Sequence, residues 1–356
     1  MASVVGSFIV SAIVPLFGPL AGGNQIVLSG SGLQYGATSD YVQSGLIALY
    51  DGIDNTGDGD KFHSNTATTW KDLSGNNYDL TLSGSLSNVP WVNGNAWTIG
   101  STAFFQRAKS QMALLPVANQ NYTVEFVWNQ ESLSSTALNG GFLGWGCNSV
   151  VNQTNNTRFF GASNRFRHYW WGNDFDFIKP ASANRIQNVS ITYGNTVGRR
   201  GYSDGVYFGN NTATNKATCA TGNFFVGKTT NNEFATGVQV FSVRIYNRAL
   251  TDAEVAQNYA VDKKRFISLP QIKIGGKTCI NTTILGADSV RCVVPAGTGT
   301  VNVTVSYDGA TDVVVGSYTY GNMTTYTWMK DGQVISSWFI NGTQVAHAWL
   351  AGVKIW

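Results

Sequence analysis

The residues best suited to ligand chemistry form a short aromatic and acidic cluster near the middle of the chain. Sugar binding needs flat aromatic rings for the apolar face of a sugar, and carboxylates or amides for its hydroxyl groups. The candidates are Trp145, His168, Tyr169, Trp170, Trp171, Asp174 and Asp176. Since adjacent residues of a strand face opposite ways, at most one of Trp170 and Trp171 is expected in the core. The alternative is that the outward tryptophan packs on a neighbouring subunit.

The carboxylates do not show the spacing of a sugar-cleaving enzyme. Cleavage needs two acids that flank the glycosidic bond. The chain has only four glutamates, and none forms such a pair: Glu125, Glu131, Glu233 and Glu254. The histidines lie in separate regions, at His63, His168 and His347. No serine or cysteine has the context of a nucleophile elbow. We therefore expect no catalytic residues.

An acidic segment at Asp51–Asp60 places four carboxylates within ten residues. It is similar to the beginning of a calcium loop with oxygen ligands. However, Asn65 stands where that loop has a bidentate glutamate. We expect a solvated turn, and calcium is the only candidate cofactor. If an ion binds, its ligands are expected to be Asp54, Asp58 and Asp60.

The four cysteines lack the CxxC or Cys/His spacing of a zinc site. Cys279 and Cys292 flank one predicted hairpin, so this pair is expected to be bridged in an oxidising compartment. Buried free thiols are the equal alternative.

The composition indicates an all-β protein. Charged residues make up 12% of the chain, and 40 glycines supply turns. The net charge of +3 is spread along the chain, which excludes a dedicated nucleic-acid surface. An apolar stretch at 8–20 is interrupted by two prolines, so no membrane span is expected. We interpret residues 1–43 as an uncleaved arm that anchors on a partner.

Short strands recur between residues 45 and 266 with Gly and Asn turns between them, which predicts a β-sandwich. One helix follows the last of these strands. Thr251 is its expected N-cap and Glu254 completes a capping box, with Leu250 and Val255 as the hydrophobic staple.

Three motifs carry a resemblance to a known family: GLIALYDG at 45–52, TWKDLSGN at 69–76 and VRIYNRALTDAEV at 243–255. They resemble the opening and closing strands of concanavalin A-like, laminin-G-type domains of bacterial surface and phage proteins. The resemblance implies a jelly-roll sandwich over residues 44–267. That fold serves lectins, adhesion modules, glycosidases and structural inserts, so it does not decide the function.

Residues 268–321 are similar to the immunoglobulin-like IPT/TIG module. A cysteine-containing stretch that ends at Pro295 precedes a strand in which Val301, Val303 and Val305 alternate with polar residues. Roughly 50 residues is short for a complete sandwich. We therefore expect a neighbour to complete the module.

Residues 322–356 contain a repeat that begins at Trp328, Trp338 and Trp349. The Asp331-Gly332 and Asn341-Gly342 pairs predict type I′ turns, and so a meander of hairpins. The segment is similar to the ends of bacteriophage structural proteins. Because a small meander is marginal alone, we expect it to oligomerise or to anchor the chain.

These features imply a non-enzymatic bacteriophage virion protein, such as a head fibre, capsid decoration or tail-associated adhesin. Its carbohydrate-binding module would face host or surface glycans, and its arm or meander would contact other virion proteins. We expect a homo-oligomer and specifically a trimer. The alternatives are a secreted or cell-surface bacterial lectin, and a polysaccharide-degrading glycosidase of the same fold.

Overall fold

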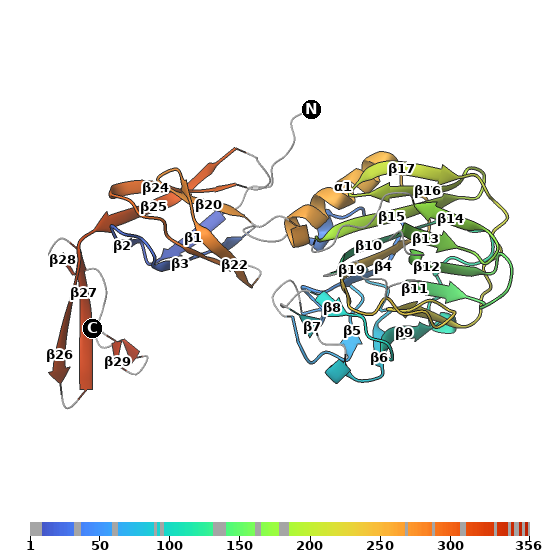
Figure 1. Ribbon diagram of the computed structural model, residues 1–356, viewed down its shortest axis with the longest axis horizontal. Helices are drawn as coiled ribbons and strands as arrows, with labels where there is room; N and C mark the ends of the chain where they lie inside the picture. Colours follow the sequence, from blue (N-terminus) through green and yellow to red (C-terminus); the bar gives the residue numbers. More distant parts are fainter. Residues whose placement is uncertain are drawn as a thin grey trace. The chain divides into compact units, whose positions relative to one another are not determined.

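A computed structural model divides the chain into two compact units, Gly36–Ile267 and a second unit that combines 1–35 with 268–356 (Figure 1). From residue 323 onward only the backbone is described. No helix among the described residues is long and apolar enough to span a membrane. The described residues are 9–31, 37–58, 63–88, 91–92, 96–130, 140–160, 165–177, 185–267, 270–286, 289–306, 311–330, 333–340, 343–344, 349–350 and 353–354.

The Gly36–Ile267 unit is a sandwich of two antiparallel sheets. The first has the order β17-β16-β15-β10-β19-β8-β7, and β4 also pairs with β19. Its strands are β4 (Leu46–Asp51), β7 (Trp91–Val92), β8 (Ala96–Thr98), β10 (Tyr122–Gln130), β15 (Gln187–Gly194), β16 (Gly198–Ser203), β17 (Val206–Asn211) and β19 (Val238–Tyr246).

The second sheet of the sandwich has the order β14-β13-β12-β11-β18-β9-β6-β5. Its strands are β5 (Thr69–Trp70), β6 (Leu80–Ser83), β9 (Phe104–Ala108), β11 (Gly141–Gly146), β12 (Thr154–Phe160), β13 (Arg165–Tyr169), β14 (Asp174–Phe177) and β18 (Asn223–Val226). Short 3-10 turns lie at Thr38–Asp40, Leu86–Asn88 and Lys109–Gln111. The predicted all-β, jelly-roll-like sandwich is confirmed.

Aromatic side chains fill the space between the two sheets. Among the described residues, five tryptophans have no exposed surface: Trp70, Trp97, Trp128, Trp145 and Trp170. The ring of Trp128 lies 4.8 Å from that of Phe166 and 5.2 Å from that of Phe159, both nearly perpendicular to it. Such edge-to-face pairs add to the stabilisation that burial of the rings provides. The alternation along β10 places Phe126 and Trp128 in this core.

The opposite face of the first sheet carries a buried ionic network. Glu125 in β10 and Arg244 in β19 are direct partners in the strand register. Arg244 donates from Nε to Glu125 at 2.8 Å, and from Nη1 and Nη2 to Asp262 at 2.7 and 2.8 Å. None of the three side chains is exposed. Burial raises the pKa of Glu125, although Arg244 opposes this shift.

Helix α1 (Asp252–Asp262) covers this network and supplies two of its members. Asn258 donates to Glu125 at 2.7 Å, while Asp262 also accepts from the hydroxyl of Tyr41 at 2.8 Å. Tyr41 lies within the stretch that we expected to be a separate arm. The sandwich unit therefore begins before residue 44, because the ring of Tyr41 packs on Arg244 and its hydroxyl binds Asp262.

The predicted capping box of α1 is confirmed, and both of its hydrogen bonds are formed. Arg248 also donates to Glu254, and this bond is the main reason why the pKa of Glu254 falls to about 2. A π-turn at Lys263–Ile267 continues the helix. In this turn Arg265 is buried and pairs with Asp51 at 2.9 Å.

The other unit contains an immunoglobulin-like pair of sheets, with the orders β1-β3-β23-β22 and β2-β25-β24-β20-β21. Its strands are β1 (Ile9–Val14), β2 (Phe17–Pro19), β3 (Gln25–Ser31), β20 (Gln271–Ile274), β21 (Lys277–Thr278), β22 (Ile280–Gly286), β23 (Ser289–Val293), β24 (Gly299–Ser306) and β25 (Val313–Gly321). Strand β3 pairs with β23, and β2 runs parallel to β25.

The chain's own N-terminal strands complete this immunoglobulin-like unit. Ile26 and Leu28 have no exposed surface and share a core with Val290, Val303 and Val305. The predicted anchoring arm over residues 1–43 is therefore wrong for 9–31. These residues are apolar because they supply β1 and β3 to one sheet of this unit and β2 to the other. The sequence of the sandwich unit is inserted between the two halves of the immunoglobulin-like unit.

The predicted bridge between Cys279 and Cys292 is also wrong, since both are free and buried in this core. A hydrogen bond with Cys279 and burial both raise the pKa of the Cys292 thiol. Thiols held protonated in an apolar core are poor nucleophiles. The disulfide of this chain joins Cys147 and Cys219 instead.

The predicted C-terminal hairpins are present in the backbone. β26 (Met323–Lys330) pairs with β27 (Gln333–Ile340), β27 pairs with β28 (Thr343–Gln344), and β29 (Trp349–Leu350) pairs with β30 (Val353–Lys354). Lys330 is opposite Gln333, so two residues connect these strands. The predicted Asp331-Gly332 and Asn341-Gly342 turns lie outside the described residues.

Replacing Arg244 tests whether the buried network holds the sandwich together. Arg244→Met leaves Glu125 and Asp262 buried without their cation, and removal of one partner of a buried pair costs about 3–5 kcal/mol. We expect the free energy of unfolding in urea to fall by about this amount. The control is Arg200→Met, because the Arg200–Asp252 pair is 41% and 58% exposed and should contribute less than about 1 kcal/mol. An equal, small effect of both changes would contradict this role.

Candidate functional site

A cavity of about 420 Å³ opens at the lateral edge of the sandwich. There β14, the last strand of one sheet, lies beside β17, the last strand of the other. Its lining residues are Arg167, Asp174, Phe175, Asp176, Phe208, Gly209, Asn210 and Asn211. We call this cavity the edge pocket. It combines charged groups, amides and aromatic rings in one concave surface.

Arg167 forms the charged centre of the edge pocket. Its strand β13 pairs with β14, so that Arg167 is opposite Asp176. The guanidinium donates to both oxygens of Asp176, at 2.6 and 2.8 Å, and to Asp174 at 2.5 Å. Bidentate pairing fixes the plane of the guanidinium. The three side chains together carry one net negative charge.

The buried Arg199 holds the Asn211 amide of the edge pocket in place. Arg199 Nη2 donates to Asn211 Oδ1 at 3.1 Å. The Arg199 guanidinium is fully buried and lies 3.8 Å from the ring centre of Trp170 and 5.7 Å from that of Phe175. Burial lowers the pKa of Arg199 to about 10. Trp170 thus supports the pocket without lining it.

Three of the residues predicted to bind sugar lie in the core instead. Trp145, His168 and Trp170 have no exposed surface. Trp145 donates its indole N–H to the carbonyl of Pro116 at 2.8 Å. Burial lowers the pKa of His168 well below its usual range, so the imidazole is neutral. These side chains belong to the packed interior of the sandwich and are not accessible at its surface.

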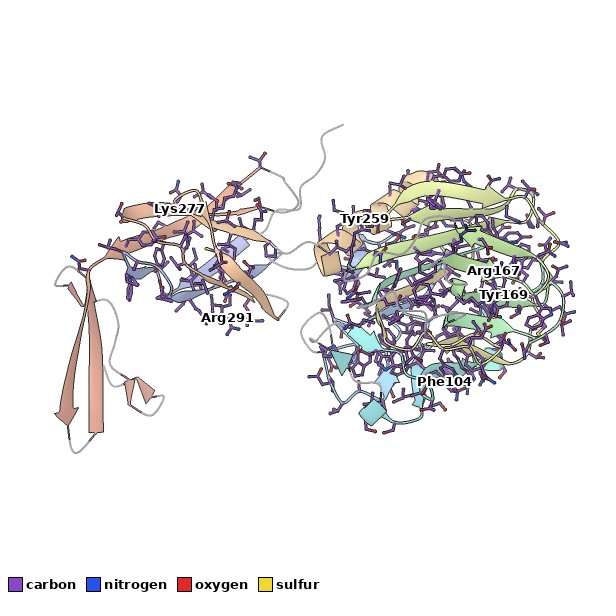
Figure 2. The ribbon with its side chains drawn as sticks, in the orientation of Figure 1. Phe104, Arg167, Tyr169, Tyr259, Lys277 and Arg291 are labelled. Atoms are coloured by element: carbon purple, nitrogen blue, oxygen red, sulfur yellow. A yellow bond between two sulfur atoms is a disulfide. The ribbon has the colours of Figure 1, made fainter. Side chains whose placement is uncertain are left out.

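Of the other four predicted sugar-binding residues, Trp171, Asp174 and Asp176 reach the outer surface, whereas Tyr169 is buried. Asp174 and Asp176 line the edge pocket. Trp171 is partly exposed. Tyr169 belongs to the same strand as Arg167, as Figure 2 shows, and its buried hydroxyl donates to Glu233 at 2.8 Å. Of the adjacent tryptophans, only Trp170 is in the core, as the strand alternation predicted.

The sequence analysis did not predict the remaining members of the edge pocket, which are Arg167, Phe175, Phe208, Gly209, Asn210 and Asn211. Those on β17 meet β14 only through packing of the two sheets, and no local spacing reveals that contact. Arg167 could have been found, because Asp174 and Asp176 follow it across one tight hairpin. A basic residue opposite an acidic residue is a typical cross-strand pair.

Of the three predicted calcium ligands in the acidic segment, two lie among the described residues. Asp54 is buried and Asp58 is exposed, whereas Asp60 lies outside the described residues. Nowhere in the described part of the chain do three His, Cys, Asp or Glu side chains gather for a metal ion. Asp51 accepts from the backbone of Ile53 at 2.8 Å and pairs with Arg265.

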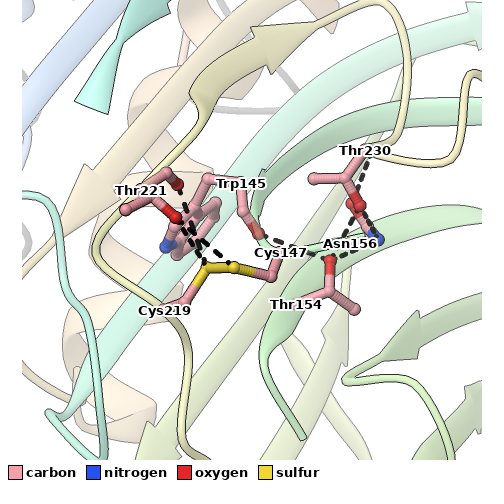
Figure 3. Close-up of a disulfide and its surroundings, with 7 residues drawn as sticks. All are labelled: Trp145, Cys147, Thr154, Asn156, Cys219, Thr221 and Thr230. Carbon is pink, nitrogen blue, oxygen red and sulfur yellow. Dashed lines mark hydrogen bonds between the residues drawn. A yellow bond between two sulfur atoms is a disulfide. The ribbon is translucent and has the colours of Figure 1, made fainter. Parts of the chain in front are cut away.

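The disulfide lies at one end of the sandwich, where it fastens two segments that are far apart in sequence. Cys147 and Cys219 are 72 residues apart, with their Cα atoms at 5.7 Å. Both backbone N–H groups donate to the carbonyl of Gln153, at 3.0 and 3.1 Å. Hydrogen bonds among Thr154, Asn156 and Thr230 continue this arrangement nearby (Figure 3).

Comparison with known proteins agrees with this architecture. Residues 105–256 match the family described as the concanavalin A-like lectin/glucanases superfamily. Those residues form a concanavalin A-like domain. Residues 265–326 match the IPT/TIG domain, and 268–326 of these belong to the immunoglobulin-like unit. None of the curated proteins compared with the chain matches it.

Several solved structures resemble the chain at low identity. Domain 4 of AbnA, a GH43 arabinanase from Geobacillus stearothermophilus, in complex with arabinotriose, is 16% identical over 60% of this chain and 98% of that one, with a TM-score of 0.43. Trypanosoma rangeli sialidase is 16% identical over 62% and 33%, with a TM-score of 0.44. The binding domain of Paraclostridial Mosquitocidal Protein 1 is 13% identical over 84% and 76%, with a TM-score of 0.45. None of these likenesses bears on the function of the concanavalin A-like domain.

Lys216 provides a pH-dependent test of charge burial in the sandwich unit. It is 2% exposed and donates to the carbonyl of Ala118 at 2.6 Å. Burial lowers its pKa from 10.5 to about 7. The Lys216 amine therefore binds its proton more tightly in the unfolded chain than in the folded one. Its burial lowers the free energy of unfolding by the full amount below pH 7, and by progressively less as the pH rises towards 10.5.

We expect Lys216→Met to stabilise the protein relative to the wild type at pH 6, with the difference shrinking as the pH rises. The difference in the free energy of unfolding between the two proteins should shrink by at most about 1.4 kcal/mol per pH unit. Urea unfolding of both proteins across pH 6 to 9 measures it. A constant difference over this range would show that the ammonium is not destabilised by burial.

Proposed function

We propose that the chain is a non-enzymatic structural protein whose edge pocket binds a neutral glycan. The observation that supports this most directly is the combination of side chains there. Arg167 and the amides of Asn210 and Asn211 offer hydrogen-bond donors, and Asp174 and Asp176 offer acceptors. A sugar hydroxyl can both donate and accept, so it fits such a mixture.

The charge of the edge pocket favours neutral over acidic sugars. At the open surface of the pocket the two carboxylates of Asp174 and Asp176 outnumber the guanidinium of Arg167, because the second cation, Arg199, is buried behind the amide of Asn211. An acidic sugar would bring another negative charge within a few ångströms of them, and like charges at that distance repel. Phe208 adds an apolar wall against which the carbon face of a sugar can pack.

The positions of the carboxylates support binding rather than hydrolysis. A glycosidase needs one acid and one base or nucleophile on either side of the scissile bond, in different environments. Asp174 and Asp176 instead bind the same guanidinium. The acidic pair Glu125 and Asp262 is completely buried beneath α1, out of reach of a substrate.

We further propose that this module is displayed on a bacteriophage particle, as a head fibre, capsid decoration or tail-associated adhesin. The support is the phage-like sequence of residues 322–356 and the Cys147–Cys219 disulfide, a bond typical of exposed surfaces such as virions. Since residues 9–31 complete the immunoglobulin-like unit, the C-terminal hairpins are the expected attachment point. We also expect these hairpins to form the contact between subunits of a homo-oligomer, and we propose that this oligomer is a trimer.

Glycan binding can be tested by removing groups at the rim of the edge pocket. We expect the full-length protein to bind neutral oligosaccharides on a printed array, and Asp174→Ala combined with Asn210→Ala to weaken that binding at least tenfold. Each lost hydrogen bond to a sugar contributes roughly 1 kcal/mol. The matched control is Asn215→Ala, which removes an exposed amide outside the pocket. Binding that is equal in all three proteins would rule out this pocket.

The display role predicts that truncation after residue 321 abolishes incorporation into particles and oligomerisation, while the sandwich remains folded. Immunoblotting of purified particles and light scattering of the truncated protein measure the two losses. A truncated protein that still enters particles would contradict attachment through the C-terminal hairpins.

A further inference from the structure

A second surface lies beside the edge pocket, at the turn between β13 and β14. We propose that Trp171, together with Val150 and Val151, forms a platform for sugar rings that extend beyond the pocket. The ligand would then be an oligosaccharide, with one ring in the pocket and at least one on the platform. This inference rests on the proposed glycan binding of the edge pocket.

The platform and the edge pocket are connected through one pair of residues. Tyr169 is opposite Asp174 in the strand register, and Asp174 lines the pocket. The rings of Tyr169 and Trp171 lie 6.5 Å apart. Trp171 follows β13 by two residues, so it lies beyond the rim of the pocket along the same hairpin. A chain of sugars leaving the pocket in this direction would meet its indole.

The backbone at Trp171 is held in a conformation that a bulky residue rarely adopts. Its φ is 65°, in the left-handed region, and that of the following Gly172 is 81°. The left-handed conformation costs a non-glycine residue roughly 1–2 kcal/mol. Glycine or asparagine would fit this position better. A tryptophan that is kept at an unfavourable backbone position, and is partly exposed, indicates a role other than stability.

Two exposed valines extend the apolar surface next to this turn. Val150 is 41% exposed and Val151 is 60% exposed. A methyl of Val151 lies 3.5 Å from the position that a side chain on Gly172 would occupy. The turns at 149–152 and 171–173 therefore touch. Apolar side chains that gather at the rim of a polar pocket are typical of ligand sites.

Hydrogen bonds lock these two turns together. The N–H of Asn152 donates to the carbonyl of Trp171 at 3.0 Å, and the amide of Asn173 donates to that of Asn152. Ala217 donates to the carbonyl of Asn152 at 2.9 Å, next to the disulfide at Cys219. The Cys147–Cys219 bridge thus holds the base of the platform. A rigid platform loses little conformational freedom when a ligand binds.

Trp171→Asn separates the role of the indole from its effect on folding, because asparagine tolerates the left-handed backbone. The probes are glucose-, galactose- and N-acetylglucosamine-based glycans, each as a monosaccharide and a tetrasaccharide. Isothermal titration of the full-length protein gives the affinities, and thermal unfolding gives the stability. The matched control is Val197→Asn, at a residue that is 62% exposed in another turn.

We expect Trp171→Asn to leave the melting temperature unchanged or higher, and to weaken binding of the tetrasaccharide about tenfold, as for loss of a strong aromatic contact. Binding of the monosaccharide should not change. Trp171→Phe should restore part of the lost affinity.

Three outcomes would overturn the platform. Unchanged tetrasaccharide binding would show that the indole makes no contact, while the edge pocket itself would stand. An equal loss for the monosaccharide and the tetrasaccharide would show that Trp171 acts only through the shape of the pocket. If the wild type binds none of the probes, the proposed glycan binding fails first, and the platform with it.

Discussion

The charge of Arg244 lies where water cannot reach it, so the surrounding chain must supply every group that stabilises it. Its partners are Glu125 in β10, Asp262 in α1 and the ring of Tyr41, which precedes β4. The network fixes β10 against β19 and holds the helix on the sheet. Strands β15, β16 and β17 pair outward from β10 in turn. The position of β17 at the edge pocket therefore depends on this one buried cation.

Three arginines in the same sandwich show how surroundings decide what a residue type does. Arg244 is paired with carboxylates and serves only the fold. Arg199 is buried against the ring of Trp170 and positions an amide above it. Arg167 lies at the surface between two carboxylates, where a ligand can still reach its pocket. Burial and the nature of the partners therefore decide which arginine stabilises the sheet, which one supports the pocket and which one lines it.

Local patterns in the sequence predicted much of the fold. The capping box at Thr251, the alternation along the strands and the strand hairpins of the tail all depend on residues that are close in sequence. The features that were missed depend on contacts between distant segments. The Cys147–Cys219 bridge, the pairing of β3 with β23 and the meeting of β14 with β17 exist only after the sheets have formed. Burial of Trp145 and His168 was missed for the same reason, since no spacing shows which strand face is covered.

The insertion of one unit within the other has a consequence for how durable the assembly is. Because the chain enters the sandwich unit at Gly36 and leaves it at Ile267, two covalent connections join it to the immunoglobulin-like unit. A module at the end of a single linker is released by one proteolytic cut. Here a protease must cleave both connections before the sandwich can be released, and a pulling force is shared between them. This twofold connection would suit the surface display that we propose for the sandwich unit.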